Sequence, residues 1–519
     1  MSLVAHQKQF VLGPLPVVVR PDWRTIRIAE RLVLSHCPKL RIEQLQSKDG
    51  ELFWLVGIAV RADDAMSAIS DGFPLRDSAE IESWSGFWAG RWCLISAERC
   101  WQDQTGCFGI FHRRVGTGFW ISNSAALLGD QLPGAPSAAR LPWHIVANKG
   151  IDWIPLPFST REGIYKLLPL RTIGPQTGGI TPLRFAAPPL KSGEEMQAIV
   201  SALKTIMTNW AQAGFRERFI GLTAGLDTRN VLAAAIAAKT DFETFTTCYP
   251  FTKKPDLRLP PRIAARVGVP YTLRRLPAID AGETEARMAA ITEHMDGTGW
   301  HRATMYIAGH AYDLLTDQGQ TVAHGNVMAG EGRGFYSAKF SNLGREVPPT
   351  DPDHILDSFT FRSSWRPKPR ALWRRAVQAW IDSLPEHLPL ALDWRDRFYL
   401  EQRAGGWNAT TQAFWDMLDG TAFYPGNCLW MTHLFLRFSP EKRKQGFPQR
   451  EAIRLLVPEL LEFPINPEPI SNRLRQTVRD LLGPKVAHTL KSLALMSRLR
   501  RAHGNAAGLD RKRPMPPRS

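Results

Sequence analysis

The sequence predicts an α/β protein with a β-rich N-terminal domain and a helical C-terminal part. Three patterns lead to this prediction. Short apolar runs separated by turn residues fill residues 1 to about 135, strand-like and helix-like segments alternate from residue 192, and residues 350–480 have a mostly helical pattern rich in Trp and Arg. Strands that alternate with helices at this spacing form a parallel sheet covered by helices.

The N-terminal strands are indicated by runs such as 53–60 and 91–96, which are rich in aromatic and branched apolar residues. Segment 90–125 has the pattern of successive antiparallel strands. A stretch rich in Pro and Gly at 174–191 then indicates a boundary. We therefore expect a first domain at 1–185, a second at 192–485 and a basic tail at 486–519.

The second domain contains the stretch on which the functional interpretation depends. Residues 219–222 form an apolar run of strand length, 223–228 a tight loop and 230–238 an Ala-rich helix. A loop that opens a helix offers backbone N–H groups and a partial positive charge to phosphate, and Asp227 beside it would hold Mg²⁺. The alternative is an ordinary strand–turn–helix without a ligand. Further strands are expected at 242–249 and 269–276, with a short helix at 262–268 between them.

The loop Thr-Ala-Gly-Leu-Asp-Thr at 223–228 resembles the pyrophosphate loop S-G-G-x-D-S of ATP pyrophosphatases. Arg229 and the order of the segments resemble the asparagine synthetase family among them. Ala224 replaces the first Gly, and Thr replaces both Ser residues. The resemblance implies that ATP binds here and that Asp227 holds Mg²⁺. The ATP-binding residues that it implies are Leu222, Thr223, Ala224, Gly225, Asp227, Thr228, Arg229 and, on the next strand, Thr247.

A second Gly-rich stretch at 329–332, Ala-Gly-Glu-Gly, resembles the second nucleotide loop S-G-E-G-x-D-E of the same family. The family's Asp beside Mg²⁺ is missing here, so Glu331 would substitute for it or Arg333 would neutralise phosphate. Arg450 stands where the family has a Lys that faces the developing phosphate charge. Glu401 lies on a charged helix that either lines an acceptor pocket or forms a solvated ion-pair face. These segments give two further nucleotide contacts and four catalytic candidates: Ala329 and Gly330, then Glu331, Arg333, Glu401 and Arg450.

The N-terminal domain resembles the family's glutaminase domain of the N-terminal-nucleophile type. The match is collinear at Gly90, Arg91, Asp103 and Ser122. The family's nucleophile is a Cys at position 2, where this chain has Ser2. We therefore expect a vestigial β sandwich that keeps a structural role and has no glutaminase activity.

The resemblance implies an ATP-dependent ligase that adenylates a substrate carboxylate, releases pyrophosphate and forms an amide without glutamine hydrolysis. β-Lactam synthetases and lasso-peptide cyclases are relatives of that kind. The acid would be a small molecule or a peptide, the latter with a partner protein that delivers it. The alternative is a catalytically inactive binding protein, which is favoured by Ala224, by the missing Asp and by Arg450 in place of Lys.

Composition limits the remaining classes of function. The net charge of +16 favours polyanions, and part of the excess lies in the 486–519 tail, which we expect to be disordered and solubilising. Nucleic-acid binding is less favoured because the tail lacks aromatic residues for base stacking. The sequence contains no run of 18 apolar residues, so we expect no membrane-spanning helix. Its six cysteines form no C-x-x-C pair, which fits a reduced, cytoplasmic protein.

Overall fold

The computed structural model describes residues 3–142, 153–249, 252–275, 281–296, 315–326, 350–359, 366–384 and 394–467. Residues 1–465 form one compact unit. The remaining residues form a second unit, of which only Asn466 and Pro467 are described. The predicted tail at 486–519 therefore lies outside the described residues, as does Ser2.

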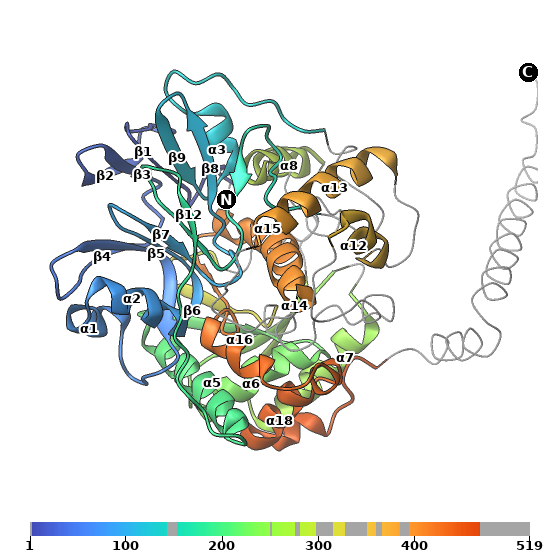
Figure 1. Cartoon of the computed structure of the whole chain (residues 1–519). Coiled ribbons are helices and arrows are strands. Elements are labelled where there is room, and N and C mark those ends of the chain that lie inside the picture. The colour runs from blue at the N-terminus through green and yellow to red at the C-terminus, as the bar shows by residue number, and fades with distance from the viewer. Residues whose placement is uncertain are drawn as a thin grey trace, which may run out of the picture. The chain divides into compact units, whose positions relative to one another are not determined.

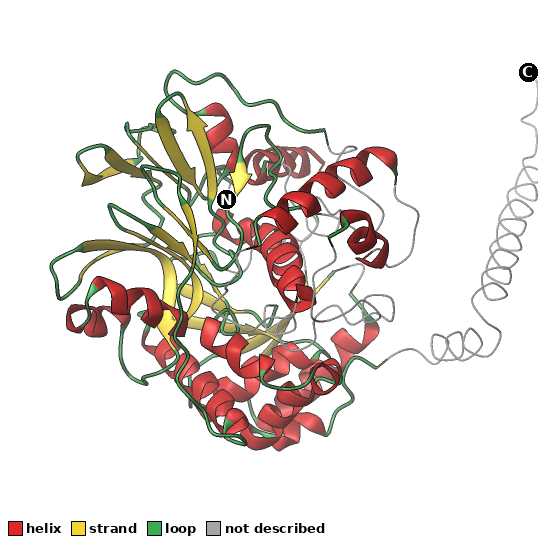
Figure 2. Cartoon of the chain, in the orientation of Figure 1, coloured by secondary structure: helices red, strands yellow, loops and turns green. Residues whose placement is uncertain are grey.

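The described N-terminal part is built on two six-stranded antiparallel sheets (Figures 1 and 2). The first sheet has the strand order β10-β8-β9-β1-β3-β2, and the second has the order β12-β11-β7-β6-β5-β4. The strands are β1 (Phe10–Gly13), β2 (Arg24–Ala29), β3 (Leu32–His36), β4 (Ile42–Gln46), β5 (Leu52–Arg61), β6 (Trp88–Ile95), β7 (Cys100–Gln102), β8 (Phe111–Val115), β9 (Gly118–Ser122), β10 (Tyr165–Lys166), β11 (Arg171–Ile173) and β12 (Ile180–Pro182).

Strand β5 shows how the two sheets form a sandwich. Trp54 and Val56 pack into one core with Phe10 of the first sheet. Phe53 and Leu55 point to the opposite face and pack into the core that the second sheet shares with the α/β part. Alternate side chains of a strand point to opposite faces, so a strand that is apolar on both faces is covered on both. The predicted β sandwich is confirmed.

Short helices form parts of the connections between strands of the sandwich. Asp77 caps one of them by accepting a hydrogen bond from the backbone N–H of Glu80 at 2.8 Å. These segments are α1 (Ile69–Gly72), η1 (Phe73–Leu75), α2 (Ser78–Trp84), η2 (Ser85–Phe87) and α3 (Ala125–Asp130).

The second half of the described chain contains a five-stranded parallel sheet with the order β15-β14-β13-β16-β17. The chain moves outward from β13 through β14 to β15 and then returns to the other side of β13 with β16 and β17. The order therefore reverses between β13 and β16, and ligands of open α/β sheets bind at the carboxyl ends of the strands at such a reversal. The strands are β13 (Glu217–Gly221), β14 (Glu243–Cys248), β15 (Tyr271–Arg275), β16 (Gln320–Ala323) and β17 (Thr421–Phe423).

Helices cover both faces of this sheet (Figure 2). Ile220 packs into a core with Leu203 and Leu232, whereas Phe219 packs into another core with Ile291. The predicted α/β class is thereby confirmed. The helical segments are α5 (Glu195–Gln212), α6 (Leu226–Ala237), α7 (Lys254–Val267), α8 (Ala281–Met295), α12 (Pro352–Phe359), α13 (Pro367–Asp382), α14 (Trp394–Phe398), the π-helix η4 (Tyr399–Asn408), α15 (Ala409–Ala413), η5 (Phe414–Met417), α16 (Leu429–Leu436), α17 (Pro440–Lys444), α18 (Phe447–Leu456) and η6 (Pro458–Leu461).

Buried polar contacts join the sandwich to the α/β part. Arg91 on β6 pairs with both carboxylate oxygens of Asp416. Asn427 donates to the Gly90 carbonyl and to Asp103, each at 2.7 Å. Because buried polar groups without partners are costly, these contacts fix how the second sheet meets η5 and the segment between β17 and α16. Among the described residues, no helix is both long enough and apolar enough to cross a membrane.

Candidate functional site

The 223–228 loop lies where the sheet topology places a ligand. β13 ends at Gly221 and α6 begins at Leu226, with Gly225 as the N-cap residue. Gly225 is extended, with φ −76° and ψ 166°, and no side chain caps the helix. Helix N-termini leave backbone N–H groups that side chains, water or ligands satisfy. An oxygen of a ligand can therefore take the place of the missing cap.

The two Thr residues of the loop bind the loop itself. The Thr223 backbone N–H donates to Thr228 Oγ1 at 3.2 Å, and the two hydroxyl oxygens lie 3.1 Å apart. The N–H of Gly225 donates to Thr223 Oγ1 at 3.0 Å. Leu222 is buried, and its carbonyl accepts from Thr246 Oγ1 at 2.7 Å. These contacts give the loop a defined shape before any ligand arrives.

The loop after β16 touches the loop after β13. A Cβ atom at Gly325 would lie 2.8 Å from the carbonyl carbon of Asp227 and 2.9 Å from the amide N of Thr228. Only glycine fits so close to backbone atoms. Sequence analysis did not single out Gly325, because a lone glycine after a strand has many explanations. The contact shows that the two loops meet at the carboxyl edge of the sheet.

An acid from a third element reaches the same loop. Asp256, in the first turn of α7, accepts a hydrogen bond from the Ala224 N–H at 2.9 Å through Oδ1. Local sequence patterns do not predict this contact, because Asp256 lies 32 residues after Ala224. Asp227 lies in the first turn of α6. One carboxylate thus belongs to the loop and a second contacts it from α7. Two negative charges at the loop repel phosphate, so a phosphate would bind here together with a cation.

The donor set of the loop fits Mg²⁺. This ion is usually held by one or two carboxylates together with phosphate oxygens and water. Asp227 and Asp256 supply two carboxylates from the first turns of α6 and α7. A larger set is not needed for this kind of site, and the described residues contain no group of three metal-ligating side chains.

Arg229 contacts the loop from the protein interior, at the Ala224 carbonyl, and its predicted contact with the nucleotide stays a prediction. Its side chain is fully buried and donates to four backbone carbonyls. α6 turns position 229 toward the protein interior, where the guanidinium supplies donors to backbone carbonyls of the loop and of segment 460–464. The acceptors are the carbonyls of Ala224, Leu460, Phe463 and Pro464.

Three other predicted nucleotide contacts remain: Thr247 near the carboxyl end of β14, and Ala329 and Gly330 in the second Gly-rich loop. Thr247 is half-buried next to the end of β14, and its carbonyl accepts from Thr252 Oγ1 at 3.4 Å. The second Gly-rich loop is described only as far as Asn326. The predicted residues Ala329, Gly330, Glu331 and Arg333 therefore lie outside the described residues.

The two remaining catalytic candidates have different surroundings. Arg450 is exposed on α18, whose N-cap Gly446 contacts Leu226 at the start of α6. Glu401 is fully buried, and Oε1 accepts from Arg171 at 3.1 Å and from Arg397 at 3.3 Å. Burial contradicts the solvated ion-pair face, which followed from the helical spacing of the charges; this spacing does not reveal the pairing with Arg171 of β11. The acceptor-pocket role, which followed from the resemblance, stays a prediction.

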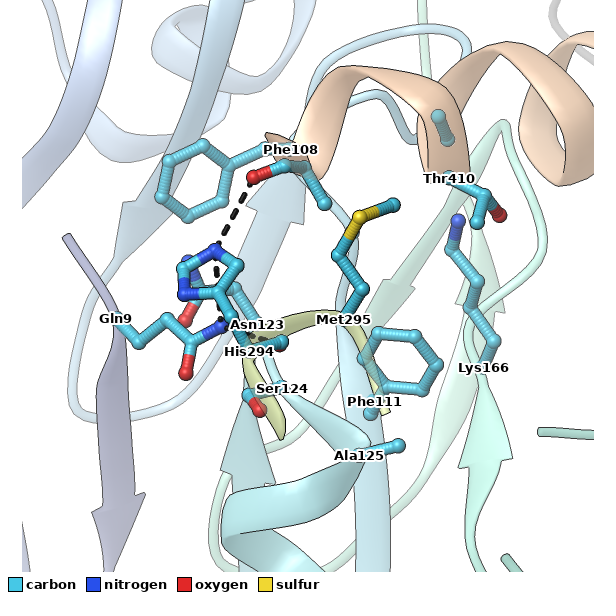
Figure 3. Close-up of a pocket in the computed structure, with 13 residues that line it drawn as sticks. Gln9, Phe108, Phe111, Asn123, Ser124, Ala125, Lys166, His294, Met295 and Thr410 are labelled. Carbon is cyan, nitrogen blue, oxygen red and sulfur yellow. Dashed lines mark hydrogen bonds between the residues drawn. The ribbon is translucent and has the colours of Figure 1, made fainter. Parts of the chain in front are cut away.

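A small cavity in another part of the molecule is shown in Figure 3. Its volume is about 30 Å³, which suits one or two water molecules and not a nucleotide. The Lys166 ammonium group lies in its wall and donates to the Gly405 carbonyl at 2.7 Å. Burial lowers the pKa of Lys166 to about 8 and that of His294 to about 4. None of the residues of the 223–228 loop lines this cavity.

Comparisons with known proteins leave the activity open. No protein-family model matches the chain, and no curated protein does. One solved structure with partial likeness is the glutamine-dependent NAD⁺ synthetase of Acinetobacter baumannii in complex with ADP, at 17% identity and a TM-score of 0.18, over 29% of this chain and 27% of that one. This chain therefore spans about a quarter of the synthetase.

Another solved structure is the glutamine phosphoribosylpyrophosphate amidotransferase of B. subtilis complexed with ADP and GMP. It is 9% identical, with a TM-score of 0.20, over 62% of this chain and 70% of that one. TM-scores this low carry no argument about function. The assignment of a site rests on the geometry of this chain.

Proposed function

We propose that the protein is an ATP-dependent ligase that activates a substrate carboxylate as an acyl-adenylate and joins it to an amine. One observation carries the proposal. The 223–228 loop stands at the carboxyl edge of a parallel sheet, at the reversal of strand order, and Gly325 of the facing loop packs against it. Asp227 and Asp256 beside the loop support the use of Mg²⁺ with the nucleotide.

The chemistry proceeds in two steps. A carboxylate oxygen of the substrate attacks the α-phosphorus of ATP, and the bond from that phosphorus to the bridging oxygen breaks, so pyrophosphate leaves. The amine nitrogen then attacks the acyl carbon, loses a proton and displaces AMP. Bound Mg²⁺ would supply charge neutralisation for the phosphates. The chain itself contributes position and dipoles, through the start of α6 and the fixed loop.

The second candidate function is an inactive protein that binds a nucleotide or a partner. Two findings favour it. Asp256 already occupies the Ala224 N–H that a phosphate would use, and the Arg229 guanidinium is engaged inside the protein. An active enzyme must shift the first of these contacts when ATP enters, whereas an inactive protein keeps it.

Pyrophosphate release in the presence of pooled small-molecule and peptide carboxylates, with ammonia and a pool of amines supplied as acceptors, separates the two candidates. The ligase releases pyrophosphate and AMP in equal amounts, only with Mg²⁺ and with at least one acid pool. The Asp227→Asn variant should lose this activity. A matched control is Asp241→Asn, which changes an exposed acid just before β14, at the opposite end of the strand. ATP binding without release under any pool would favour the inactive protein.

A further inference from the structure

Arg229 holds the 223–228 loop from beneath. The guanidinium donates to the Ala224 carbonyl at 3.1 Å and to the Pro464 carbonyl at 2.7 Å. It also donates to the carbonyls of Leu460 at 3.0 Å and Phe463 at 2.7 Å. One side chain thus joins the loop to the 460–464 segment, about 230 residues later in the chain.

The hydrogen bond from Arg229 to the Ala224 carbonyl sets the orientation of the peptide between Ala224 and Gly225. In a trans peptide, the carbonyl of one residue and the N–H of the next point in opposite directions. Because Arg229 holds the Ala224 carbonyl inward, the N–H of Gly225 points away from Arg229, toward Thr223 Oγ1 at 3.0 Å. If this peptide turned over, it would present a carbonyl oxygen where a phosphate oxygen needs a donor.

The 460–464 segment also contacts the helix on the other side of the loop. Arg262 of α7 lies over the Phe463 ring at 5.6 Å, and Arg266 of α7 pairs with Glu462 at 2.6 Å. The same helix carries Asp256, which binds the Ala224 N–H. The segment therefore connects the two helices that hold Ala224, one at its carbonyl and the other at its N–H.

The positive charge of Arg229 also favours a phosphate on the loop. All its acceptors among the described residues are carbonyls, so it has no carboxylate partner there. Burial and the nearby Arg450 lower the pKa of Arg229 to about 10, so the group stays charged at neutral pH. A buried cation below the start of α6 attracts an anion on the loop, as the helix dipole does.

We propose that Arg229 is a positioning residue that holds the 223–228 loop in its phosphate-binding shape and couples that shape to the 460–464 segment. The link to phosphate rests on the proposed function, whereas the coupling of loop and segment does not. Four variants separate the effect on phosphate from the coupling. Arg229→Met removes the guanidinium hydrogen bonds and the charge, whereas Arg229→Lys keeps only the charge. Arg266→Met loosens the segment without touching the loop, and Arg450→Met removes a neighbouring exposed cation.

The test combines amide hydrogen exchange without nucleotide and calorimetric titration with ATP and Mg²⁺. In Arg229→Met, exchange at residues 223–228 should rise at least tenfold while β5 and β6 stay protected, and ATP affinity should fall at least tenfold. Arg229→Lys should show the increase in loop exchange with a smaller loss of affinity. Arg266→Met should raise loop exchange by a smaller factor than Arg229→Met, because the loosened segment stays joined to the loop through Arg229. Arg450→Met should leave loop exchange as in the wild type. If Arg229→Met does not fold, Arg229→Lys decides.

Unchanged loop exchange in the Arg229 variants or in Arg266→Met would overturn the coupling. A rise in loop exchange with unchanged ATP affinity would overturn the positioning role. If the wild-type protein binds no ATP, the proposed function fails, and the exchange measurement still decides whether Arg229 couples loop and segment.

Discussion

Asp256 and Ala224 form a hydrogen bond that places a carboxylate on the 223–228 loop, with Oδ1 2.9 Å from the Ala224 amide N. An Asn at position 256 can still accept this bond and removes the negative charge. We predict that Asp256→Asn binds ATP about fivefold more tightly than the wild type in the absence of Mg²⁺, because removing one like charge near the surface is worth about 1 kcal/mol. Titration with ATP in a chelator checks this. Equal or weaker binding would show that Asp256 does not face the phosphates.

Gly325 should tolerate no side chain. A Cβ there meets backbone atoms of Asp227 and Thr228 at 2.8 and 2.9 Å, and backbone moves less readily than side chains. Gly325→Ala should lower the free energy of unfolding by about 1–3 kcal/mol and weaken ATP binding. The matched variant is Gly221→Ala at the end of β13, where a Cβ meets only Phe245 at 3.8 Å. Urea denaturation of both variants gives the comparison, and equal stability of the two would contradict the close approach.

Glu401 should matter for folding more than for catalysis. Its carboxylate accepts from Arg171, Arg397 and the indole N–H of Trp380 in a buried cluster. Glu401→Gln leaves two buried guanidinium groups without a counter-ion, and we expect a loss of about 3–5 kcal/mol in the free energy of unfolding.

The control for Glu401 is Glu451→Gln, which breaks the more exposed pair with Arg454 and should cost less than about 1 kcal/mol. ATP affinity per folded molecule should be the same in both variants. A Glu401→Gln protein that is as stable as the wild type and loses only activity would instead support the acceptor-pocket role.

Stability above pH 8 should depend on Lys166. Burial lowers its pKa from 10.5 to about 8, so between these values the unfolded chain binds a proton that the folded protein lacks. The contribution of Lys166 to the free energy of unfolding therefore rises with pH in this window, by at most about 1.4 kcal/mol per pH unit. Below pH 8 the contribution is constant and at its least favourable.

The measurement is the difference in unfolding free energy between the wild type and Lys166→Met at pH 7.5, 8.5 and 9.5. It should shift in favour of the wild type as pH rises, since Cys and Tyr titrations cancel in the difference. Lys191→Met, at an exposed position, should give a flat difference. A flat line for Lys166→Met as well would show that its amine titrates as in water.

Local patterns predicted the strand, loop and helix around residue 225, because each depends on residues close in sequence. Contacts across long stretches were not predictable in this way. The carbonyl acceptors of Arg229 at 460–464 and the partner Arg171 of Glu401 lie more than 200 residues away. Helical spacing marks which residues share a face, and it does not identify the element that covers that face.

The helix predicted at 262–268 was too short for a related reason. Pro260 and Pro261 indicate a helix end, yet α7 runs through them from Lys254. Its buried residues Leu259, Ile263 and Ala264 pack into the main core. This packing offsets the hydrogen bonds that the two prolines cannot donate, and it depends on tertiary neighbours that the local sequence does not contain.

The central claim is that the 223–228 loop binds the phosphates of ATP together with Mg²⁺ at Asp227. The most direct measurement is a calorimetric titration of ATP, with and without Mg²⁺, into the wild type, Asp227→Asn and Asp241→Asn. We predict Mg²⁺-dependent binding to the wild type and Asp241→Asn, and at least a tenfold loss in Asp227→Asn. Binding that is unchanged in Asp227→Asn, or no binding to the wild type at millimolar ATP, would contradict the claim.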